Sequence, residues 1–357
     1  MRHSYGTAAI AFLAGLGPAQ KPQQASTPSY WIKQLELPGR HEVAAERLVG
    51  FGTKAAAGLA GCLADPRPQI RLRAVRALGF LGEAGEPALA ALLALDSGKD
   101  ANESLAIASA VDAIRGGRGL LLVADFQGGK LLKLDGLGNE RLICDGLPQL
   151  RSARRLASGN YLVAMKEGVR EITPAGATVW SVSHAIPSDA VRIDNNRTLI
   201  AAADSHRVFE VDSTGKVTWS YTDEDREFRP VSCQRLRNGN TLIVNYPVED
   251  LLAGSVIEID RDKNVIWELP WKQPAMAQRL SGERTLLVSH VPGRVQIVNK
   301  KGKTLKLFQD VGIPSFAEYL PNGHLLVGGE GFVRELDGNG KRLWNKSVPW
   351  VVHIQRH

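Results

Sequence analysis

Residues 235–243 read RLRNGNTLI, and the chain continues with VIEID at residues 256–260 and a tryptophan at position 267. The Asn-Gly pair favours a tight turn, and the aliphatic run after it favours a buried strand. The second segment alternates apolar and acidic residues, which is typical of a strand with one buried face. This stretch therefore predicts antiparallel β-strands joined by short turns.

The same pattern recurs along the last two thirds of the chain. The strand that follows the turn begins at residues 120, 161, 198, 241, 285 and 324. Four strands per unit at a period of roughly 40 residues are what the blades of a β-propeller require. Residues 118–357 are therefore predicted to form an all-β propeller of six blades.

The C-terminal segment supplies a strand that the first unit lacks. Later units begin with a further strand, such as ARRL at residues 153–156, whereas the first unit starts at Gly119 without one. Residues 351–354, VVHI, form a last copy of this strand with no unit behind them. We expect the segment to pair beside the first unit and to close the ring, so that no sheet edge stays open. In this alignment Val351 takes the small position between blades, and His353 takes a position where other copies have arginine.

The repeat unit can be written A-x-R-L-x-N-G-N-T-L-I … V-x-E-x-D-x-x-G-x-V-x-W, and it resembles the quinoprotein-like and arylsulfotransferase-like propeller repeats. Residues 235–267 and 188–219 are its nearest copies, and the resemblance covers residues 118–357. The resemblance implies a propeller whose site, where it has one, lies on the central channel. It does not select an activity, because many unrelated functions share such propellers.

A small all-α domain is predicted in front of the propeller. Residues 1–117 contain 25 alanines and the following 240 residues contain 15, which is a change from helix to strand composition. The segment RLVGFG at residues 47–52 recurs as RALGFLG at residues 76–82. A period of about 30 residues favours stacked helical hairpins.

The helical part also resembles a known repeat. Ile70, Ala74 and Leu78 keep the spacing of one buried helix face, and with Asp65 and Pro66 they resemble the HEAT-repeat motif. We predict a HEAT-like domain over residues 29–117, in which Asp65 caps a helix that begins at Pro66. Two roles stay open for this domain: it offers a surface for protein contact, or it only packs against the propeller.

The N-terminal residues are predicted to direct export. A short basic start precedes an apolar run at residues 8–16 and small residues at 17–19, which is the pattern of a signal peptide. We assign residues 1–19 to a signal peptide and 20–28 to a linker, and the alternative is that the apolar run is a first helix of the helical domain. No stretch reaches the roughly 20 apolar residues of a membrane span. The expected location is periplasmic or extracellular.

Composition excludes several classes of function. The net charge is +7 without a block of Lys and Arg, so we expect no nucleic-acid partner. Cys62, Cys144 and Cys233 are too few and too scattered for a disulfide framework or a zinc site. No vicinal cysteine pair occurs, although such a pair is common in propeller dehydrogenases that bind pyrroloquinoline quinone, which also have a larger ring. We therefore predict neither a cofactor nor a metal.

Two recurring kinds of side chain are predicted to be structural. Arginines recur just before the repeat Leu or Ile, and glutamates recur in the third strands of the same blades. Opposite charges that repeat in one unit favour a lattice of ion pairs, and the alternative is a cationic ring for an acidic polymer. Tryptophans at one position per blade favour packing between blades. These residues are Arg155, Arg192, Arg235 and Arg279; Glu171, Glu210 and Glu258; and Trp180, Trp219, Trp267 and Trp344. The histidines His184, His206 and His290 share no spacing and are expected at the surface.

Candidate ligand-binding residues come from the strands predicted to line the central channel. In the arylsulfotransferase-like pattern this strand often begins with a His-Asp pair, but in this chain Ser188 precedes Asp189. Trp271 and Trp350 each follow a proline and depart from the regular tryptophan positions, which favours ligand stacking. The candidates are Asp189, Arg154, Gln234, Gln278, Glu318, Trp350 and Trp271.

Two hypotheses about function follow. The first is a non-catalytic, exported recognition or scaffolding protein, monomeric, whose partner is another protein or an envelope polysaccharide. The alternative is a propeller enzyme of arylsulfotransferase or lactonase type that uses Asp189, Arg154 and Glu318 in the channel. The hypotheses differ in whether these side chains converge around an open pocket, or whether larger side chains such as Phe316 plug it.

Overall fold

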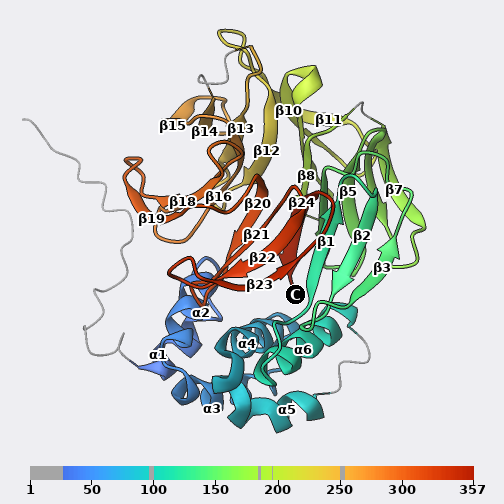
Figure 1. Cartoon of the computed structure of the whole chain (residues 1–357). Helices are drawn as coiled ribbons and strands as arrows, with labels where there is room; N and C mark the ends of the chain where they lie inside the picture. The colour runs from blue at the N-terminus through green and yellow to red at the C-terminus, as the bar shows by residue number, and fades with distance from the viewer. Residues whose placement is uncertain (1–26, 96–99, 184–185, 195, 250–253) are drawn as a thin grey trace, which may run out of the picture.

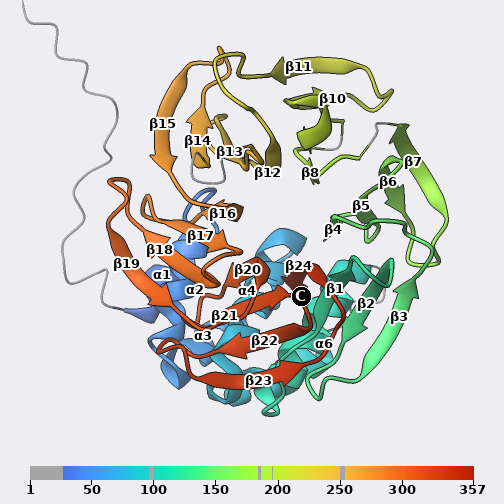
Figure 2. The ribbon, with the colours of Figure 1, turned by 45° about the horizontal axis from the view of Figure 1, so that its top comes forward.

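The repeated aliphatic segments form the second strands of six four-stranded sheets, which stand around a central axis as the blades of a propeller (Figure 2). The computed structural model describes residues 27–357 except 96–99, 184–185, 195 and 250–253. The predicted signal peptide and most of the predicted linker lie outside the described residues. Helices cover part of the propeller end at which the C-terminus lies (Figure 1). The predicted six-bladed propeller preceded by a small helical region is confirmed.

Each blade is an antiparallel sheet of four strands, which follow one another from the inner to the outer edge. Blade 1 consists of β24 (Val351–Arg356), β1 (Leu121–Asp125), β2 (Lys130–Leu134) and β3 (Glu140–Cys144). Blade 2 consists of β4 (Ser152–Arg155), β5 (Tyr161–Met165), β6 (Gly168–Ile172) and β7 (Thr178–Ser183). Blade 3 consists of β8 (Asp189–Arg192), β9 (Thr198–Ala202), β10 (Arg207–Val211) and β11 (Val217–Tyr221).

The remaining blades follow the same order. Blade 4 consists of β12 (Pro230–Arg235), β13 (Thr241–Asn245), β14 (Ser255–Ile259) and β15 (Val265–Pro270). Blade 5 consists of β16 (Pro274–Arg279), β17 (Thr285–Ser289), β18 (Arg294–Val298) and β19 (Thr304–Phe308). Blade 6 consists of β20 (Pro314–Tyr319), β21 (Leu325–Gly329), β22 (Phe332–Leu336) and β23 (Arg342–Lys346).

The core lies between the blades. The second strand of every blade is buried along its whole length. These strands are continuous aliphatic runs because each one has a neighbouring blade on both of its faces. Outer strands such as β7 and β15 instead have no fully buried residue, and most of their residues are exposed to solvent. The result is a ring of apolar clusters between the blades.

The C-terminal strand closes the ring, but in a different register from the predicted one. β24 pairs antiparallel with β1, which confirms the closure. Within this pairing Arg356 lies opposite Leu121, as Arg155 lies opposite Tyr161 in blade 2. The strand is therefore displaced by three residues from the sequence alignment, and the predicted positions of Val351 and His353 are wrong.

A glycine in the neighbouring blade explains how the C-terminal strand fits. Ile354 occupies the small position at which Ala153 stands in blade 2. A Cβ atom added to Gly328 of blade 6 would lie 2.8 Å from Cδ1 of Ile354 and 2.4 Å from Cγ1 of Val351. The missing side chain at Gly328 therefore provides the space for two β-branched residues at the closing strand.

The predicted arginine–glutamate lattice is present, and it joins neighbouring blades. Arg192, Arg235, Arg279 and Arg356 each pair with a glutamate on the third strand of the preceding blade. Three of the four pairs have N–O distances of 2.6, 2.8 and 2.9 Å. The pairs are Arg192–Glu171, Arg235–Glu210, Arg279–Glu258 and Arg356–Glu335. The predicted packing role of the tryptophans holds for Trp180, Trp219 and Trp267, whose indole N–H groups donate to backbone carbonyls of the next blade.

Two blade junctions replace the ion pair with another contact. Between blades 5 and 6 the equivalent residues are Ile297 and Tyr319, which pack in one apolar cluster. Between blades 1 and 2 they are Lys133 and Arg155, two cations. There the Arg155 Nε atom donates to Asn102 of the helical region at 2.7 Å. The helical region therefore satisfies the one arginine of the lattice that faces a lysine.

The helical region contains α1 (Pro28–Gln34), α2 (His41–Val49), α3 (Thr53–Cys62), α4 (Pro68–Leu81), the 3₁₀ segment η2 (Gly82–Ala88), α5 (Leu89–Ala94) and α6 (Ala101–Ile114). The sequence repeat is visible in the backbone, because Gly52 and Gly82 have φ values of 55° and 56°, which favour glycine.

The helix predicted to begin at Pro66 begins instead at Pro68. Asp65 accepts a hydrogen bond from the Arg67 N–H in the turn before it, at 2.8 Å.

Among the described residues, one helical stretch, Pro68–Ala94, is long and apolar enough to cross a membrane by length and composition alone. This finding differs from the expectation that no stretch reaches that length. The stretch is interrupted by η2, and Ala74, Leu78 and Leu92 on it are buried in the core of the helical region. Core helices of soluble proteins can have the same length and composition.

Polar and apolar contacts join the helices to the propeller. Besides the Asn102–Arg155 bond, Glu46 of α2 pairs with Arg284 at 2.8 Å. Phe80 of α4 packs against the apolar cluster between blades 6 and 1. The helices therefore cover part of the propeller end at which the inner strands finish.

Candidate functional site

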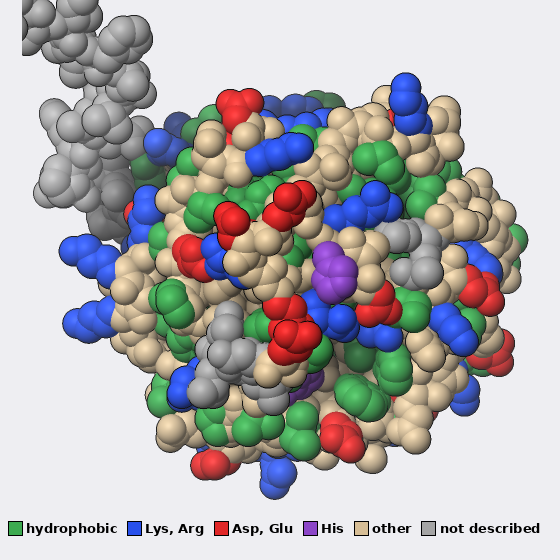
Figure 3. All heavy atoms as spheres, turned by 90° about the horizontal axis from the view of Figure 1, so that it is seen from above, with side chains coloured by type: hydrophobic (Ala, Val, Ile, Leu, Met, Phe, Trp, Pro, Cys, Tyr) green, Lys and Arg blue, Asp and Glu red, His purple; other side chains and the backbone are tan. Residues whose placement is uncertain are grey.

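The inner strands direct alternate residues towards the central axis, and the two ends of the channel differ. Towards the end opposite the helices, six equivalent positions surround a cavity, which we call the mouth. They are Ser152, Asp189, Ser232, Met276, Phe316 and His353. Acidic and basic side chains alternate over the face that carries the mouth, without a block of one sign (Figure 3).

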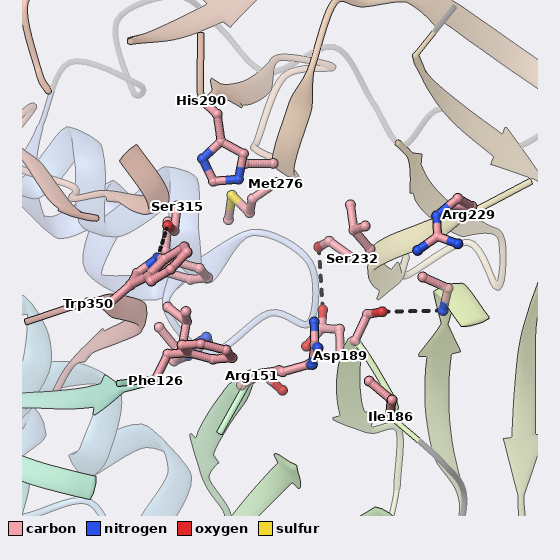
Figure 4. Close-up of a pocket in the computed structure, with 18 of the residues that line it drawn as sticks. Phe126, Arg151, Ile186, Asp189, Arg229, Ser232, Met276, His290, Ser315 and Trp350 are labelled. Carbon is pink, nitrogen blue, oxygen red and sulfur yellow. Dashed lines mark hydrogen bonds between the residues drawn. The ribbon is translucent and has the colours of Figure 1, made fainter. Parts of the chain in front are cut away.

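The mouth is an open cavity of about 320 Å³. Trp350 and Phe126 form one wall, with their ring centroids 5.1 Å apart, and Asp189, Ser232 and Arg229 lie on the opposite side (Figure 4). The Trp350 indole N–H donates to Ser315 Oγ at 3.0 Å, which fixes the ring. Large side chains therefore line the mouth without filling it.

Arg154 and Asp189, two of the predicted site residues, form a largely buried ion pair between blades 2 and 3. Arg154 Nη1 donates to Asp189 Oδ1 at 2.5 Å, and Arg154 Nη2 donates to Asp189 Oδ2 at 3.2 Å. Asp189 also accepts a hydrogen bond from the Cys233 N–H at 3.2 Å, and Arg154 donates to the Ala190 carbonyl at 2.6 Å. Burial would raise the pKa of Asp189, but the Arg154 guanidinium outweighs it and holds the pKa below its usual value. Asp189 is therefore a carboxylate with most of its acceptor capacity already used.

His353 lines the mouth, and the sequence does not reveal it, because the repeat match places its strand three residues out of register. Its ring centroid lies 4.2 Å from that of Phe316, and no hydrogen bond joins it to a residue within the described ranges. Burial, reinforced by the charge of Arg154, holds the pKa of His353 well below 6.5. The imidazole is therefore neutral at pH 7 and weakly basic.

Loop residues bring positive charge and a second imidazole to the mouth. Arg229 pairs with Asp204 at 3.3 Å. Arg151 lies over the Phe126 ring at 5.8 Å and has no carboxylate within ion-pairing distance among the residues that are described. His290, expected at the surface, lines the mouth instead, and burial lowers its pKa. Arg151 is therefore a cation of the mouth without a carboxylate partner in the described part of the chain.

Gln234, Gln278 and Glu318 face a different cavity. They line a space of about 440 Å³, which we call the chamber, between the inner strands and helices α2 and α4. Gln234 accepts a hydrogen bond from the Arg279 N–H at 2.8 Å, and Glu318 accepts one from the Arg356 N–H at 2.9 Å. Gln234 and Glu318 therefore satisfy N–H groups at the free edge of the next blade's inner strand.

The predicted site residues therefore fall into three places. Arg154, Asp189 and Trp350 line the mouth, whereas Gln234, Gln278 and Glu318 line the chamber. Trp271 lies on neither wall: its indole donates to Ser289 Oγ at 2.7 Å, with Arg294 over its ring at 5.5 Å. Arg154 and Glu318 do not share a cavity.

Neither a metal centre nor a cysteine site is assembled by the described part of the chain. No group of three or more His, Cys, Asp or Glu side chains in it is placed to hold a metal ion. Cys62, Cys144 and Cys233 are free thiols, and burial raises the pKa of each. The chemistry that the mouth offers is hydrogen bonding, one unpaired guanidinium and an aromatic wall.

A solved structure of low sequence identity with a TM-score above 0.5 shares the fold of the propeller. A protein of unknown function from Bacteroides caccae is similar with a TM-score of 0.55 at 16% identity, over 66% of this chain and 97% of its own. Virginiamycin B lyase from Staphylococcus aureus has a TM-score of 0.46 at 10% identity, with 65% and 81% covered. BamB from Moraxella catarrhalis has a TM-score of 0.35 at 16% identity, with 65% and 73% covered. No family model and no curated protein matches the sequence.

Proposed function

We propose that the protein is an exported, non-catalytic recognition protein that binds its ligand in the mouth of the propeller. One observation carries the proposal: the mouth is open, while Asp189 and His353, the acid and the base on its inner strands, are poorly suited to proton transfer. Asp189 is bound by Arg154, Ser232 and the Cys233 N–H. His353 has a pKa well below 6.5, and general bases work best when their pKa lies near the working pH.

The walls of the mouth favour a ligand group with an aromatic ring and a negative charge. Trp350 and Phe126 offer a face for ring stacking, and Arg151 beside them is a cation without a carboxylate partner within the described segments. A volume of about 320 Å³ has room for one or two amino-acid residues, at the small end of the range for binding sites. The ligand that fits this chemistry is the C-terminal carboxylate of a partner protein whose last residue is aromatic.

Saturation-transfer NMR tests the proposal with three probes: N-acetyl-L-phenylalanine, its amide, and cellobiose as a neutral sugar. The acid is expected to receive saturation and the amide much less, because only the acid can pair with Arg151. The spectra of the acid should also stay unchanged over hours, since no chemistry is expected. Binding of cellobiose alone would contradict the protein partner and point to a polysaccharide. The absence of binding for all three would contradict the mouth as a recognition site.

A second candidate function is an enzyme of arylsulfotransferase or lactonase type. The observation that favours it is His353, which supplies the channel with a neutral imidazole close enough to Arg154 and Asp189 for their charges to act on it. Incubation with 4-nitrophenyl sulfate plus phenol, and with dihydrocoumarin, tests the two reactions. Turnover that is lost in His353→Gln would establish the enzyme and overturn the recognition protein.

The proposal includes the remaining organisation of the chain. Residues 1–19 act as a signal peptide, 20–28 as a linker, 29–117 as a HEAT-like scaffold and 118–357 as a quinoprotein-like propeller. Export rests on the basic start and the apolar run of the N-terminus. N-terminal sequencing of protein from the native host should find a mature chain that begins near Gln20. A retained Met1 in the cytoplasm would contradict export.

A further inference from the structure

The chamber between the helices and the propeller is rich in hydrogen-bond donors. It is bounded by α2 and α4 on one side and by the ends of the inner strands of blades 1, 4, 5 and 6 on the other. Gln234 and Gln355 use their Oε1 atoms to accept the N–H groups of Arg279 and Arg155, at 2.8 and 3.0 Å. Each amide oxygen already accepts one hydrogen bond, whereas the Nε2–H donors of these two side chains have no partner among the described residues.

Most charged groups of the chamber already have partners. Glu42 pairs with Arg237 and Glu46 pairs with Arg284, both at 2.8 Å. The two remaining pairs belong to the lattice between blades, Arg279–Glu258 and Arg356–Glu335. Within each of these four pairs the two charges cancel. The net charge of the chamber is therefore set by the groups that have no ion-pair partner.

Arg76 on α4 is a cation of the chamber with no acidic partner among the described residues. It lines the chamber, and neither a hydrogen bond nor an ion pair joins it to a residue that the structure describes. The side chain is accessible, yet protein surrounds it closely enough that burial lowers its pKa. Arg73, one turn before it, donates to the Leu35 carbonyl at 2.7 Å. Both guanidinium groups retain donors for a ligand.

The pKa values of the two histidines of the chamber are lowered in part by its positive charge. The pKa of His41 is lowered to about 4 by burial and by the charges of Arg73, Arg237 and Arg76. The pKa of His357 is lowered to about 3, again by burial and by nearby cations that include Arg76. Both rings are therefore neutral at pH 7. Glu318 is the one remaining acid, and burial raises its pKa to about 7.

We propose that the chamber is a second binding site, which takes a small anion that presents several acceptor oxygens, such as a tricarboxylate or a sugar phosphate. Arg76 holds the anion from the helical side, and the Nε2 groups of Gln234 and Gln355 hold it from the propeller side. A volume of about 440 Å³ is larger than a single phosphate requires and suits a ligand of this size. The anion therefore joins the helical region to the propeller.

Calorimetric titration of the full chain with citrate, glucose 6-phosphate and inorganic phosphate tests this site. Saturable binding of at least one of them is expected at constant ionic strength. Arg76→Gln should weaken that binding by about tenfold or more, because charge-assisted hydrogen bonds are lost. Arg76→Lys, which keeps the charge, should weaken it less. Arg115→Gln, at an exposed arginine of the same region, should leave it unchanged.

The three probes also separate the sources of the anion. Preference for citrate indicates a polycarboxylate, and preference for glucose 6-phosphate indicates a phosphorylated sugar. A thermal shift that saturates with the same ligand, and that is lost in Arg76→Gln, provides an independent readout. The proposal is overturned when none of the probes binds, or when Arg76→Gln and Arg115→Gln bind them as tightly as the unaltered chain.

Discussion

Arg356 Nη2 lies 2.9 Å from Glu335 Oε2 across the seam at which the last strand of the chain meets the sixth blade. The pair has the geometry of the lattice that joins blades 2 to 5, so the seam is built like the other junctions. Glu335 also binds His324, with 2.7 Å between its Oε1 atom and Nδ1 of the ring. The closing strand is therefore held by side chains as well as by its ladder with β1.

Removal of residues 349–357 should open the ring. Blade 1 would lose its inner strand, and Val351 and Ile354, which are 0% and 1% exposed, would no longer cover the neighbouring cluster. Each buried aliphatic side chain contributes roughly 1.5–3 kcal/mol, so the free energy of unfolding should fall by several kcal/mol. Thermal unfolding followed by circular dichroism measures the loss. An unchanged melting temperature would contradict closure by this strand.

Lys133→Glu should stabilise the protein. Lys133 occupies the position that carries a lattice glutamate in four other blades, and it faces Arg155. Burial lowers its pKa, and the charges of Arg141 and Arg155 lower it further. A carboxylate at this position would complete the lattice and raise the free energy of unfolding by up to about 1 kcal/mol. Urea denaturation measures the change, with Lys130→Glu at the exposed end of the same strand as the control. A stabilisation that both variants share would contradict the lattice as its cause.

Asp189→Asn should destabilise the propeller. The substitution leaves the Arg154 guanidinium in a largely buried site without its carboxylate, which typically costs about 3 kcal/mol or more. Because the pKa of Asp189 lies below its usual value, the carboxylate stabilises the fold at neutral pH, and this contribution is lost only as the pH falls through that lowered pKa. Urea denaturation at pH 7 measures the loss. The double variant with Arg154→Met should recover part of it, and simple additivity of the two losses would show that the residues are not coupled.

Glu318→Gln should stabilise the protein at high pH. A carboxyl whose pKa is raised to about 7 favours the folded state when protonated, and this stability is lost as the pH rises from about 4.5 through 7. Glutamine retains an oxygen for the Arg356 N–H, as Gln234 does for Arg279. The gain in the free energy of unfolding should reach at most about 3 kcal/mol at pH 8 and vanish near pH 4. Denaturation at both pH values measures it. An equal effect at pH 4 and pH 8 would show that titration of Glu318 is not the cause.

The sequence predicts the propeller because each blade must bury one strand on both faces. The six copies of that strand can be recognised in the sequence as aliphatic runs. The arginines and glutamates of the lattice can be predicted because they recur at the same positions of several repeat units. The register of the closing strand could not be predicted in the same way. The similarity of residues 351–354 to the other inner strands takes no account of Gly328, whose missing side chain makes room for Ile354. Because the predicted register is wrong, the sequence also does not identify His353 as a residue of the mouth.

The rest of the site depends on contacts that have no period along the chain. Arg151 and Phe126 reach the mouth from loops of different blades, and neither repeats in the other units. The chamber exists only because α4 packs against the ends of the inner strands, which places Arg76 near Glu318. Tertiary packing between two regions brings these residues together, so their spacing in the sequence carries no signal.

Calorimetric titration of N-acetyl-L-phenylalanine into the full chain and into Arg151→Gln tests recognition at the mouth most directly. Arg141→Gln, at an exposed arginine of the outer strand β3, serves as the matched control. We expect saturable binding that is weakened about tenfold or more by Arg151→Gln and unchanged by Arg141→Gln, because the mouth loses its unpaired cation. Equal affinity in all three proteins, or no binding to any of them, would contradict recognition at the mouth.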